Sequence, residues 1–171
     1  MVAFPTPVNW MWRVSIARVD VDGPFSALPG VDRALVVTSG KGLELRIGNR
    51  FVAINRYESI AFSGHEPTEA TLLDGPVDDV NLMVRREYGA LPRWTVEHLE
   101  RGAYVILGHA VAAIILDGVV TLSTPTASFP FTPKRVRATR FDALLPSLGN
   151  ADEGASASVT RDAVLAFAWL D

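Results

Sequence analysis

The chain of 171 residues is long enough for one domain or for two small fused halves. Its 49% hydrophobic content is enough for a sizeable core, its net charge of -3 argues against a nucleic-acid surface, and the lack of cysteine excludes disulfides and thiolate catalysis. Residues 1–9 do not resemble a signal peptide, and the longest apolar run, 105–116, is too short for a bilayer. A soluble cytoplasmic protein without membrane contact is therefore expected.

Short apolar segments bounded by Gly, Pro, Asn and Asp predict strands rather than helices in the first half of the chain. Residues 12–21 alternate loosely between apolar and polar side chains. The aliphatic run 34–38 is followed by turn residues at 39–42 and by the alternating segment 43–47, which predicts a hairpin. Further short strands are expected at 50–54, 59–62 and 70–73.

The second half repeats this pattern. Asp117-Gly118 predicts a hairpin turn between strands at 111–116 and 119–122. Loops are expected at 123–133 and 150–158. The other expected strands are 94–99, 104–107, 135–139, 142–145, 156–160 and 164–169.

A weak internal repeat relates the two halves. Residues 35–45 and 57–62 have counterparts at 113–122 and 140–145, an offset of about 80 residues. This offset is longer than solenoid periods and suggests that one β module was duplicated. Many short strands separated by turns are typical of a barrel or sandwich.

Asp79 and Asn81 are the first candidates for a binding site. They are two residues apart, so on an extended strand their side chains point to the same face. Burying such a pair is unfavourable unless it serves a ligand or satisfies the backbone. Arg85 and Arg86 can form forked hydrogen bonds with a carboxylate. The alternative is that the pair caps turns and that Arg85 neutralises Asp79 at the surface.

Arg33, Phe25 and Ser26 are the second set of candidates. Turn residues between 23 and 30 predict a tight loop that carries Phe25 and Ser26. Arg33 begins a buried strand, where a permanent charge requires a partner. An internal ion pair that fixes the loop to the sheet is the alternative to ligand binding by Arg33 alone. Its candidate partners are Asp32, Asp79 and an anionic ligand.

Metal and nucleophile motifs are absent from the sequence. The three histidines are His65, His98 and His109, and none lies within four residues of another, so no His-x-His or His-Glu-x-x-His pattern occurs. The sequence also lacks a nucleophile elbow and a dinucleotide fingerprint. No metal, cofactor or catalytic residue is therefore assigned. Trp12 is expected in the core, with Ser15 on the opposite face of its strand.

Segments 12–17, 23–33 and 74–86 resemble the HutD/Ves family, bacterial proteins with a double-cupin fold. The resemblance implies an all-β chain of two RmlC-like jelly-roll modules, 1–90 and 91–171, packed as one bicupin unit with few or no helices. HutD-like proteins occur with histidine-degradation genes. This association implies a cytoplasmic accessory or regulatory protein that binds a small carboxylate of the urocanate or N-formylglutamate class.

The ligand is thus expected to be a small anionic metabolite. Its expected contacts are Arg33, Asp79, Asn81 and Arg85, with Phe25 and Ser26 at the rim of the pocket. Two other classes stay open. One is a metal-independent cupin isomerase or hydrolase with Asp79 or a histidine as general base, and the other is a purely structural or interaction protein.

One departure from the family concerns the residues before Trp12. They do not reproduce the Trp-Lys-Asn segment followed by glycines that the family carries there. Either the start is placed downstream of the natural one, or the pocket lacks one wall. In the second case an exposed sheet edge is expected, which a homodimer partner could cover.

Overall fold

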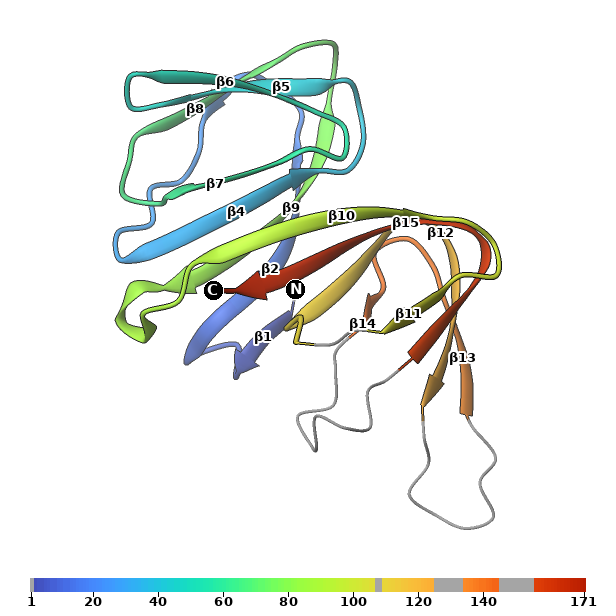
Figure 1. Cartoon of the computed structure of the whole chain (residues 1–171). Helices are drawn as coiled ribbons and strands as arrows, with labels where there is room; N and C mark the ends of the chain where they lie inside the picture. The colour runs from blue at the N-terminus through green and yellow to red at the C-terminus, as the bar shows by residue number, and fades with distance from the viewer. Residues whose placement is uncertain (1, 107–108, 125–133, 145–155) are drawn as a thin grey trace. The chain divides into compact units, whose positions relative to one another are not determined.

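The computed structural model describes residues 2–106, 109–124, 134–144 and 156–171. In these ranges the chain forms β-strands and one 3₁₀ turn, η1 (Arg86–Tyr88), and no α-helix. The expectation of an all-β chain with few or no helices is confirmed for the described residues. They group into two compact units, Met1–Trp94 with Leu170–Asp171, and Thr95–Trp169 (Figure 1).

Two antiparallel sheets build the first unit. Their strands are β1 (Val2–Pro5), β2 (Trp10–Val19), β3 (Gly23–Pro24), β4 (Val31–Val37), β5 (Gly42–Ile47), β6 (Arg50–Asn55), β7 (Ser59–Ser63), β8 (Thr68–Leu72) and β9 (Val77–Arg85). One sheet has the order β1-β2-β9-β4-β7 and the other has the order β3-β8-β5-β6. Figure 1 shows the two sheets as layers that face each other, so the inner face of each is shielded by the other.

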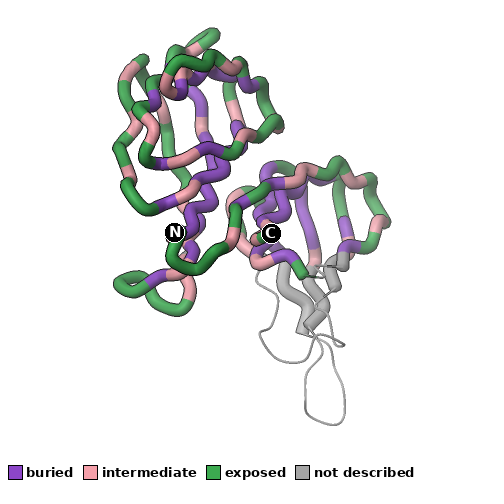
Figure 2. Tube along the Cα trace, turned by 60° about the vertical axis from the view of Figure 1, so that its left-hand side comes forward, coloured by how far each residue is buried: buried purple, intermediate pink, exposed green. Residues whose placement is uncertain are grey.

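The core of the first unit lies between these sheets because alternate residues of each strand point inward. On β5, the side chains of Leu43, Leu45 and Ile47 are fully buried, as the alternating pattern predicts. They belong to an apolar cluster with residues from β4, β6, β7, β8 and β9. Figure 2 shows the buried positions following the strands, with exposed positions concentrated in the turns.

The hairpin predicted between 34–38 and 43–47 is wrong. β4 pairs with β7 and β9, whereas β5 pairs with β6 and β8. The connection carries the chain from one sheet to the other instead of reversing it within one sheet. At Gly40, a Cβ would lie 2.5 Å from the carbonyl oxygen of Pro76, so this crossing requires glycine.

The strands of the second unit form one sheet with the order β10-β15-β12-β13, in which β11 also pairs with β15 and β14 with β12. The apolar core of this unit includes Ile115, Leu165 and Phe167. The strands are β10 (Pro92–Leu99), β11 (Tyr104–Ile106), β12 (Ala112–Thr124), β13 (Lys134–Ala138), β14 (Ala143–Leu144) and β15 (Ser156–Leu170).

The hairpin turn predicted at Asp117-Gly118 is also wrong. β12 runs straight through this dipeptide, and its register against β15 shifts between Ile115 and Val120. The positive φ of Gly118, +90°, therefore belongs to a bulge rather than to a turn. A Cβ at this position would collide with the carbonyl oxygen of Asp162 and with Ala163.

The same local turn occurs in both units. Tyr57 and Phe141 have φ values of 70° and 69°, a left-handed conformation that is unusual for aromatic residues. The backbone N–H of Tyr57 donates to the carbonyl of Val37 over 2.7 Å. In the second unit, the N–H of Phe141 donates to Ile115 over the same distance. The two turns thus correspond, but with Phe141 equivalent to Tyr57, one residue after the Arg140 that the sequence repeat pairs with it.

Several expectations concern edges, loops and the surface. β1 pairs with Trp10–Val14 of β2 and is itself the edge strand of this sheet. The predicted loops extend over 125–133 and 150–155, which lie outside the described residues.

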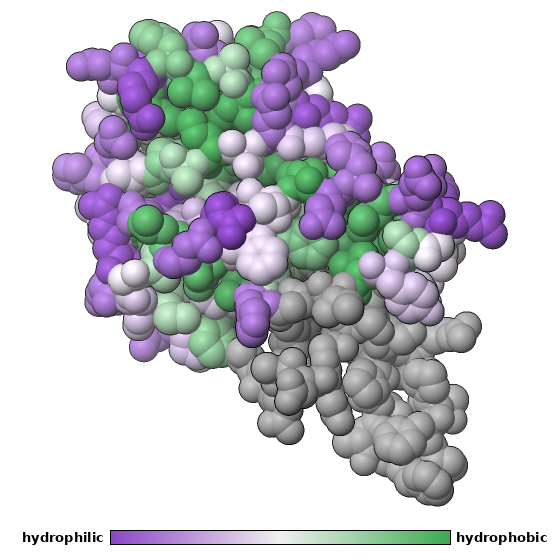
Figure 3. All heavy atoms as spheres, viewed as in Figure 1, coloured by the Kyte–Doolittle hydropathy of each residue, from purple (hydrophilic) through white to green (hydrophobic). Residues whose placement is uncertain are grey.

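Among the described residues no helix is long and apolar enough to cross a membrane. Figure 3 shows hydrophilic side chains along the margins of one face, with hydrophobic residues between them.

Candidate functional site

A cavity of about 400 Å³ lies within the first unit, against the inner face of the sheet formed by β2, β9 and β4. We refer to it as the first-unit cavity. It lies beneath the loop that links β3 to β4. Five of the six residues expected to contact a ligand line it, namely Arg33, Asp79, Asn81, Phe25 and Ser26.

The strand register explains why the polar side chains meet in this cavity. Asp79 and Asn81 are alternate residues of β9, and both are buried on its inner face. Ser15 of β2 pairs with Asn81 and also lines the cavity. Trp12 has only 6% exposure and, three residues from Ser15, points to the opposite face, as expected.

A chain of hydrogen bonds connects the three buried polar residues. Nη2 of Arg33 donates to Oδ1 of Asn81 over 2.7 Å. The side-chain amide of Asn81 in turn donates from Nδ2 to Oδ1 of Asp79. Asn81 therefore uses its acceptor toward the cation and its donor toward the carboxyl group, which fixes the orientation of its amide.

Arg33 is 6% exposed, and its guanidinium lies near two aromatic rings. Its Cζ is 5.2 Å from the ring centroid of Phe25 and 5.1 Å from that of Phe62. Burial lowers the pKa of Arg33, and the negative charge of Asp79 opposes this shift. Nε of Arg33 is buried, and no described residue accepts a hydrogen bond from it. A buried donor of this kind is unfavourable unless another molecule accepts from it.

Asp79 is the most unusual acid of the described chain because its side chain is only 1% exposed. Burial raises the pKa of Asp79 to about 7, although the charge of Arg33 and the hydrogen bond from Asn81 act in the opposite direction. Asp79 therefore changes its charge near neutral pH. A carboxyl group with this property can act as a proton donor or acceptor toward a molecule in the cavity.

Arg13 is a cavity residue that the sequence argument missed. It lines the cavity beside Ser15, and its positive charge contributes to lowering the pKa of Arg33. Nε of Arg13 donates to the sulfur of Met83 over 3.2 Å, and its Cζ lies 4.8 Å from the ring centroid of Trp10. The alternation that placed Ser15 opposite Trp12 applies equally to Arg13, so the signal was present in the sequence.

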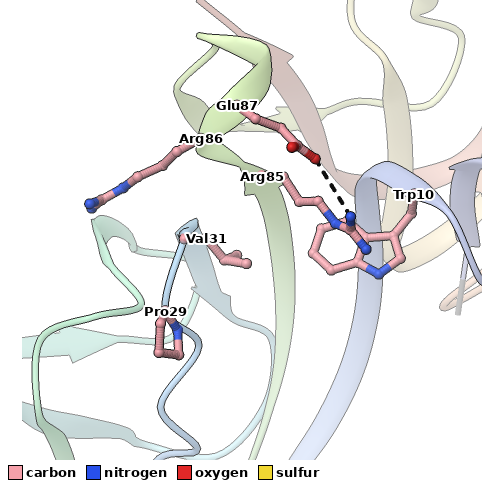
Figure 4. A pocket seen from close by; sticks show the side chains of 7 residues that line it. Trp10, Pro29, Val31, Arg85, Arg86 and Glu87 are labelled. Atoms are coloured by element: carbon pink, nitrogen blue, oxygen red, sulfur yellow. Dashed lines mark ion pairs between the residues drawn. The ribbon is translucent and has the colours of Figure 1, made fainter.

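Arg85 does not lie with the other predicted residues. It lines a second pocket of about 450 Å³, where its Cζ is 5.0 Å from the ring centroid of Trp10 and Nη1 is 3.5 Å from the carboxylate of Glu87. Figure 4 shows Arg85 pointing toward Trp10 and Glu87, while Arg86 points away from both. Arg85 is six positions after Asp79 along β9, a distance of about 20 Å on an extended strand.

Two of the alternative pairings are also wrong. Asp79 is buried, so Arg85 does not neutralise it at the surface. Asp32 is not the partner of Arg33, because its carboxylate accepts from Nε and Nη2 of Arg86 at 3.0 and 2.7 Å. The internal pairing of Arg33 instead runs through Asn81 to Asp79.

The histidines do not contribute to either pocket lining. His65, His98 and His109 are all exposed. In the described ranges, no three side chains of the His, Cys, Asp or Glu type are grouped so that they could hold a metal ion. The ionisable residues of the first-unit cavity are Arg13, Arg33 and Asp79.

The second unit lacks the polar residues of the first. The repeated turn aligns β4 with the start of β12, and β9 with the end of β15. In this alignment the counterparts are Val111 for Arg33, Leu165 for Asp79 and Phe167 for Asn81. All three are apolar, and Leu165 and Phe167 belong to the core of the second unit. Polar side chains at these positions are thus not required by the fold itself.

Curated relatives match about half of the chain. Protein Ves of Cronobacter sakazakii is 35% identical over 86 residues, which is 49% of this chain and 48% of that protein. An uncharacterized 21.2 kDa protein in the hutC 3' region of Pseudomonas putida is 33% identical over 85 residues, 48% of this chain and 45% of that protein. The matched segment thus spans about half the length of these relatives.

Solved structures resemble the chain over nearly its whole length. A conserved protein of unknown function from Pseudomonas aeruginosa is 26% identical, with a TM-score of 0.74 over 95% of this chain and 81% of that one. HutD from Pseudomonas fluorescens has a TM-score of 0.67 at 19% identity, covering 100% and 86%. A cupin 2 conserved barrel domain protein from Leptotrichia buccalis has a TM-score of 0.59 at 12% identity, covering 94% and 84%.

These similarities confirm a cupin-like β fold, and they link the family to the histidine-utilisation region. The HutD family model matches residues 2–160, which is most of the sequence. This match includes all the residues that line the first-unit cavity. The chain belongs to the HutD family.

Proposed function

We propose that this protein is a cytoplasmic accessory or regulatory protein of histidine utilisation that binds a small carboxylate in the first-unit cavity. The observation that carries the proposal is the Nε atom of Arg33, a buried donor at a cavity wall for which the described residues supply no acceptor. A carboxylate can accept two parallel N–H···O hydrogen bonds from a guanidinium. One such edge of the group consists of Nε and the neighbouring Nη atom. A bound carboxylate would therefore satisfy the donor that the protein leaves open.

The charges of the cavity favour an anion. Arg13 and Arg33 supply two positive charges, whereas Asp79 supplies at most one negative charge and less than one below pH 7. The rings of Phe25 and Phe62 keep water from the faces of the Arg33 guanidinium, which strengthens its interaction with an anion. A volume of about 400 Å³ suits a metabolite of a few carbon atoms.

Urocanate and N-formylglutamate are the ligands we propose to test first. Both are small carboxylates of the histidine-degradation route with which HutD-like proteins are associated. We further propose that the two units are two cupin modules of one bicupin. In this arrangement the first module binds the ligand, and the second has exchanged the corresponding polar residues for apolar ones.

The test is thermal unfolding with urocanate, N-formylglutamate, histidine and glutamate. A ligand present at about one hundred times its dissociation constant adds about 2.7 kcal/mol, or roughly 5–10 °C for a chain of this size. Arg33→Met should abolish the shift. Arg46→Met is the matched control, because the side chain of Arg46 is 40% exposed, pairs with Glu69 and does not line the cavity. No shift with any carboxylate, or an equal shift in Arg33→Met, would refute the proposal and favour a structural role.

A second candidate function rests on Asp79. An acid with a pKa of about 7 that touches a cavity is suited to general acid–base catalysis, as in a metal-independent isomerase. Incubating the protein with the same carboxylates in D₂O tests this alternative by proton NMR. Deuterium incorporation at carbon, lost in Asp79→Asn, would identify an enzyme, whereas ligand binding without exchange would exclude proton abstraction from those ligands.

A further inference from the structure

We propose that the first-unit cavity binds a small dicarboxylate together with one proton, which is taken from solvent onto the carboxylate of Asp79. The ligand thereby replaces Asp79 as the counter-ion of Arg33. This inference rests on the proposed function and specifies the charge of its ligand. No covalent bond forms or breaks except the O–H bond of Asp79.

The charge count of the cavity favours this stoichiometry. Its ionisable lining groups are Arg13 from β2, Arg33 from β4 and Asp79 from β9. Two guanidinium groups balance two carboxylates of a ligand only when Asp79 is neutral. With Asp79 ionised, the same dicarboxylate would leave one excess negative charge in a buried site, which is strongly unfavourable.

The groups that face Asp79 support the same conclusion. The loop between β3 and β4 contributes Phe25 and Ser26, which do not titrate near neutral pH. Asp78, the next residue on β9, lies on the other face of the strand, where it accepts from Arg18 and Ser39. A ligand carboxylate near Arg33 would thus add the dominant new negative charge beside Asp79, and like charges favour the protonated acid.

The hydrogen-bond chain allows Asp79 to carry the proton without rearrangement. Asn81 donates to Oδ1 of Asp79, and an acid protonated on Oδ2 retains this acceptor. The protonated group also gains a donor. It can donate to a ligand oxygen, as the ionised form cannot. Burial already brings the pKa of Asp79 to about 7, so adding the proton near neutral pH requires little free energy.

Isothermal titration in two buffers with different ionisation enthalpies measures the protons taken up. The probes are N-formylglutamate, whose two carboxylates stay ionised above pH 6, and N-formylglutamine, which carries one carboxylate fewer. At pH 8, we expect uptake close to one proton per N-formylglutamate. Its dissociation constant should rise about tenfold per pH unit above pH 7 and level off below about pH 6. N-formylglutamine should bind with little uptake.

Two variants separate the role of Asp79 from general charge effects. Asp79→Asn should bind N-formylglutamate without proton uptake and with an affinity that is constant from pH 6 to pH 8. Asp20→Asn, an exposed carboxylate paired with Arg18, should behave like the wild type. If Asp79→Asn does not fold, the proton count and the pH dependence of the wild type decide the question.

The outcomes distinguish this inference from the proposed function. N-formylglutamate binding with a constant affinity and no proton uptake would overturn the inference and leave carboxylate binding intact. A folded Asp79→Asn variant that fails to bind N-formylglutamate would also overturn it. If neither probe binds to the wild type at any pH, the proposed function fails and this inference fails with it.

Discussion

Replacing Asp79 by Asn should change how the stability of the ligand-free protein depends on pH. In the folded state burial raises the pKa of Asp79 from 3.8 to about 7. Between these values the unfolded chain has released the proton while the folded chain retains it. The wild type therefore loses stability as the pH rises from about 4 to 7, and the loss is complete above pH 7.

The magnitude follows from the pKa difference. A shift of about three pKa units corresponds to about 4 kcal/mol. About 3 kcal/mol of this loss falls between pH 5 and pH 8, a range in which most carboxylates stay ionised. Asp79→Asn cannot lose a proton, and its amide can still accept the hydrogen bond from Asn81. Its free energy of unfolding, relative to the wild type, should therefore rise by about 3 kcal/mol from pH 5 to pH 8.

Urea unfolding of both proteins at pH 5, 6, 7 and 8, followed by tryptophan fluorescence, measures this difference. All other ionisable groups occur in both proteins and cancel in it. Asp20→Asn serves as the control for removal of one carboxylate at the surface, and its difference from the wild type should not depend on pH in this range. If the Asp79→Asn difference stays constant within about 0.5 kcal/mol, Asp79 is an ordinary acid and the argument is refuted.

Three further substitutions test other parts of the structure. Arg33→Met removes the charge that holds down the pKa of the buried acid, so the pH at which stability levels off should rise in the same urea series. Gly118→Ala should lower the free energy of unfolding by at least about 1 kcal/mol more than Gly75→Ala. Both glycines have positive φ, but only at Gly118 would the added Cβ collide with backbone atoms. Trp94→Phe removes the buried 3.0 Å hydrogen bond to the carbonyl of Ala34 and should cost about 1–3 kcal/mol in urea unfolding.

The strands could be predicted from the sequence, whereas their partners could not. Alternation identified Leu43, Leu45 and Ile47 as inward residues of one strand, because the side-chain period is a local property. Pairing depends on contacts between distant segments. Local patterns therefore predict a hairpin turn at both Gly40 and Gly118. Gly40 instead lies in a crossing between the two sheets, and Gly118 lies in a bulge.

The site was predictable to a similar extent. The spacing of Asp79 and Asn81 predicts that both side chains lie on one face of a strand. The expected burial of Arg33 predicts a polar partner for it, and in the structure its guanidinium donates to Asn81, which in turn donates to Asp79. Arg85 was included because it is close in sequence, but the length of β9 carries it to another pocket. Alternation already places Arg13 on the same face of its strand as Ser15, whereas the pairing of β2 with β9, which brings that face beside Asn81, is not specified by local patterns.

The comparison between the two units gives the strongest reason to regard Arg33, Asp79 and Asn81 as functional. Polar residues at these positions destabilise the fold, since the ionised carboxyl group alone costs about 4 kcal/mol above pH 7 and an arginine donor has no acceptor in the part of the chain that the structure describes. In the second unit the same backbone positions carry apolar residues, two of which, Leu165 and Phe167, belong to its core. Selection for stability alone would favour that solution in both units. The retention of a buried cation, amide and acid around a cavity is therefore best explained by a ligand whose binding offsets their cost.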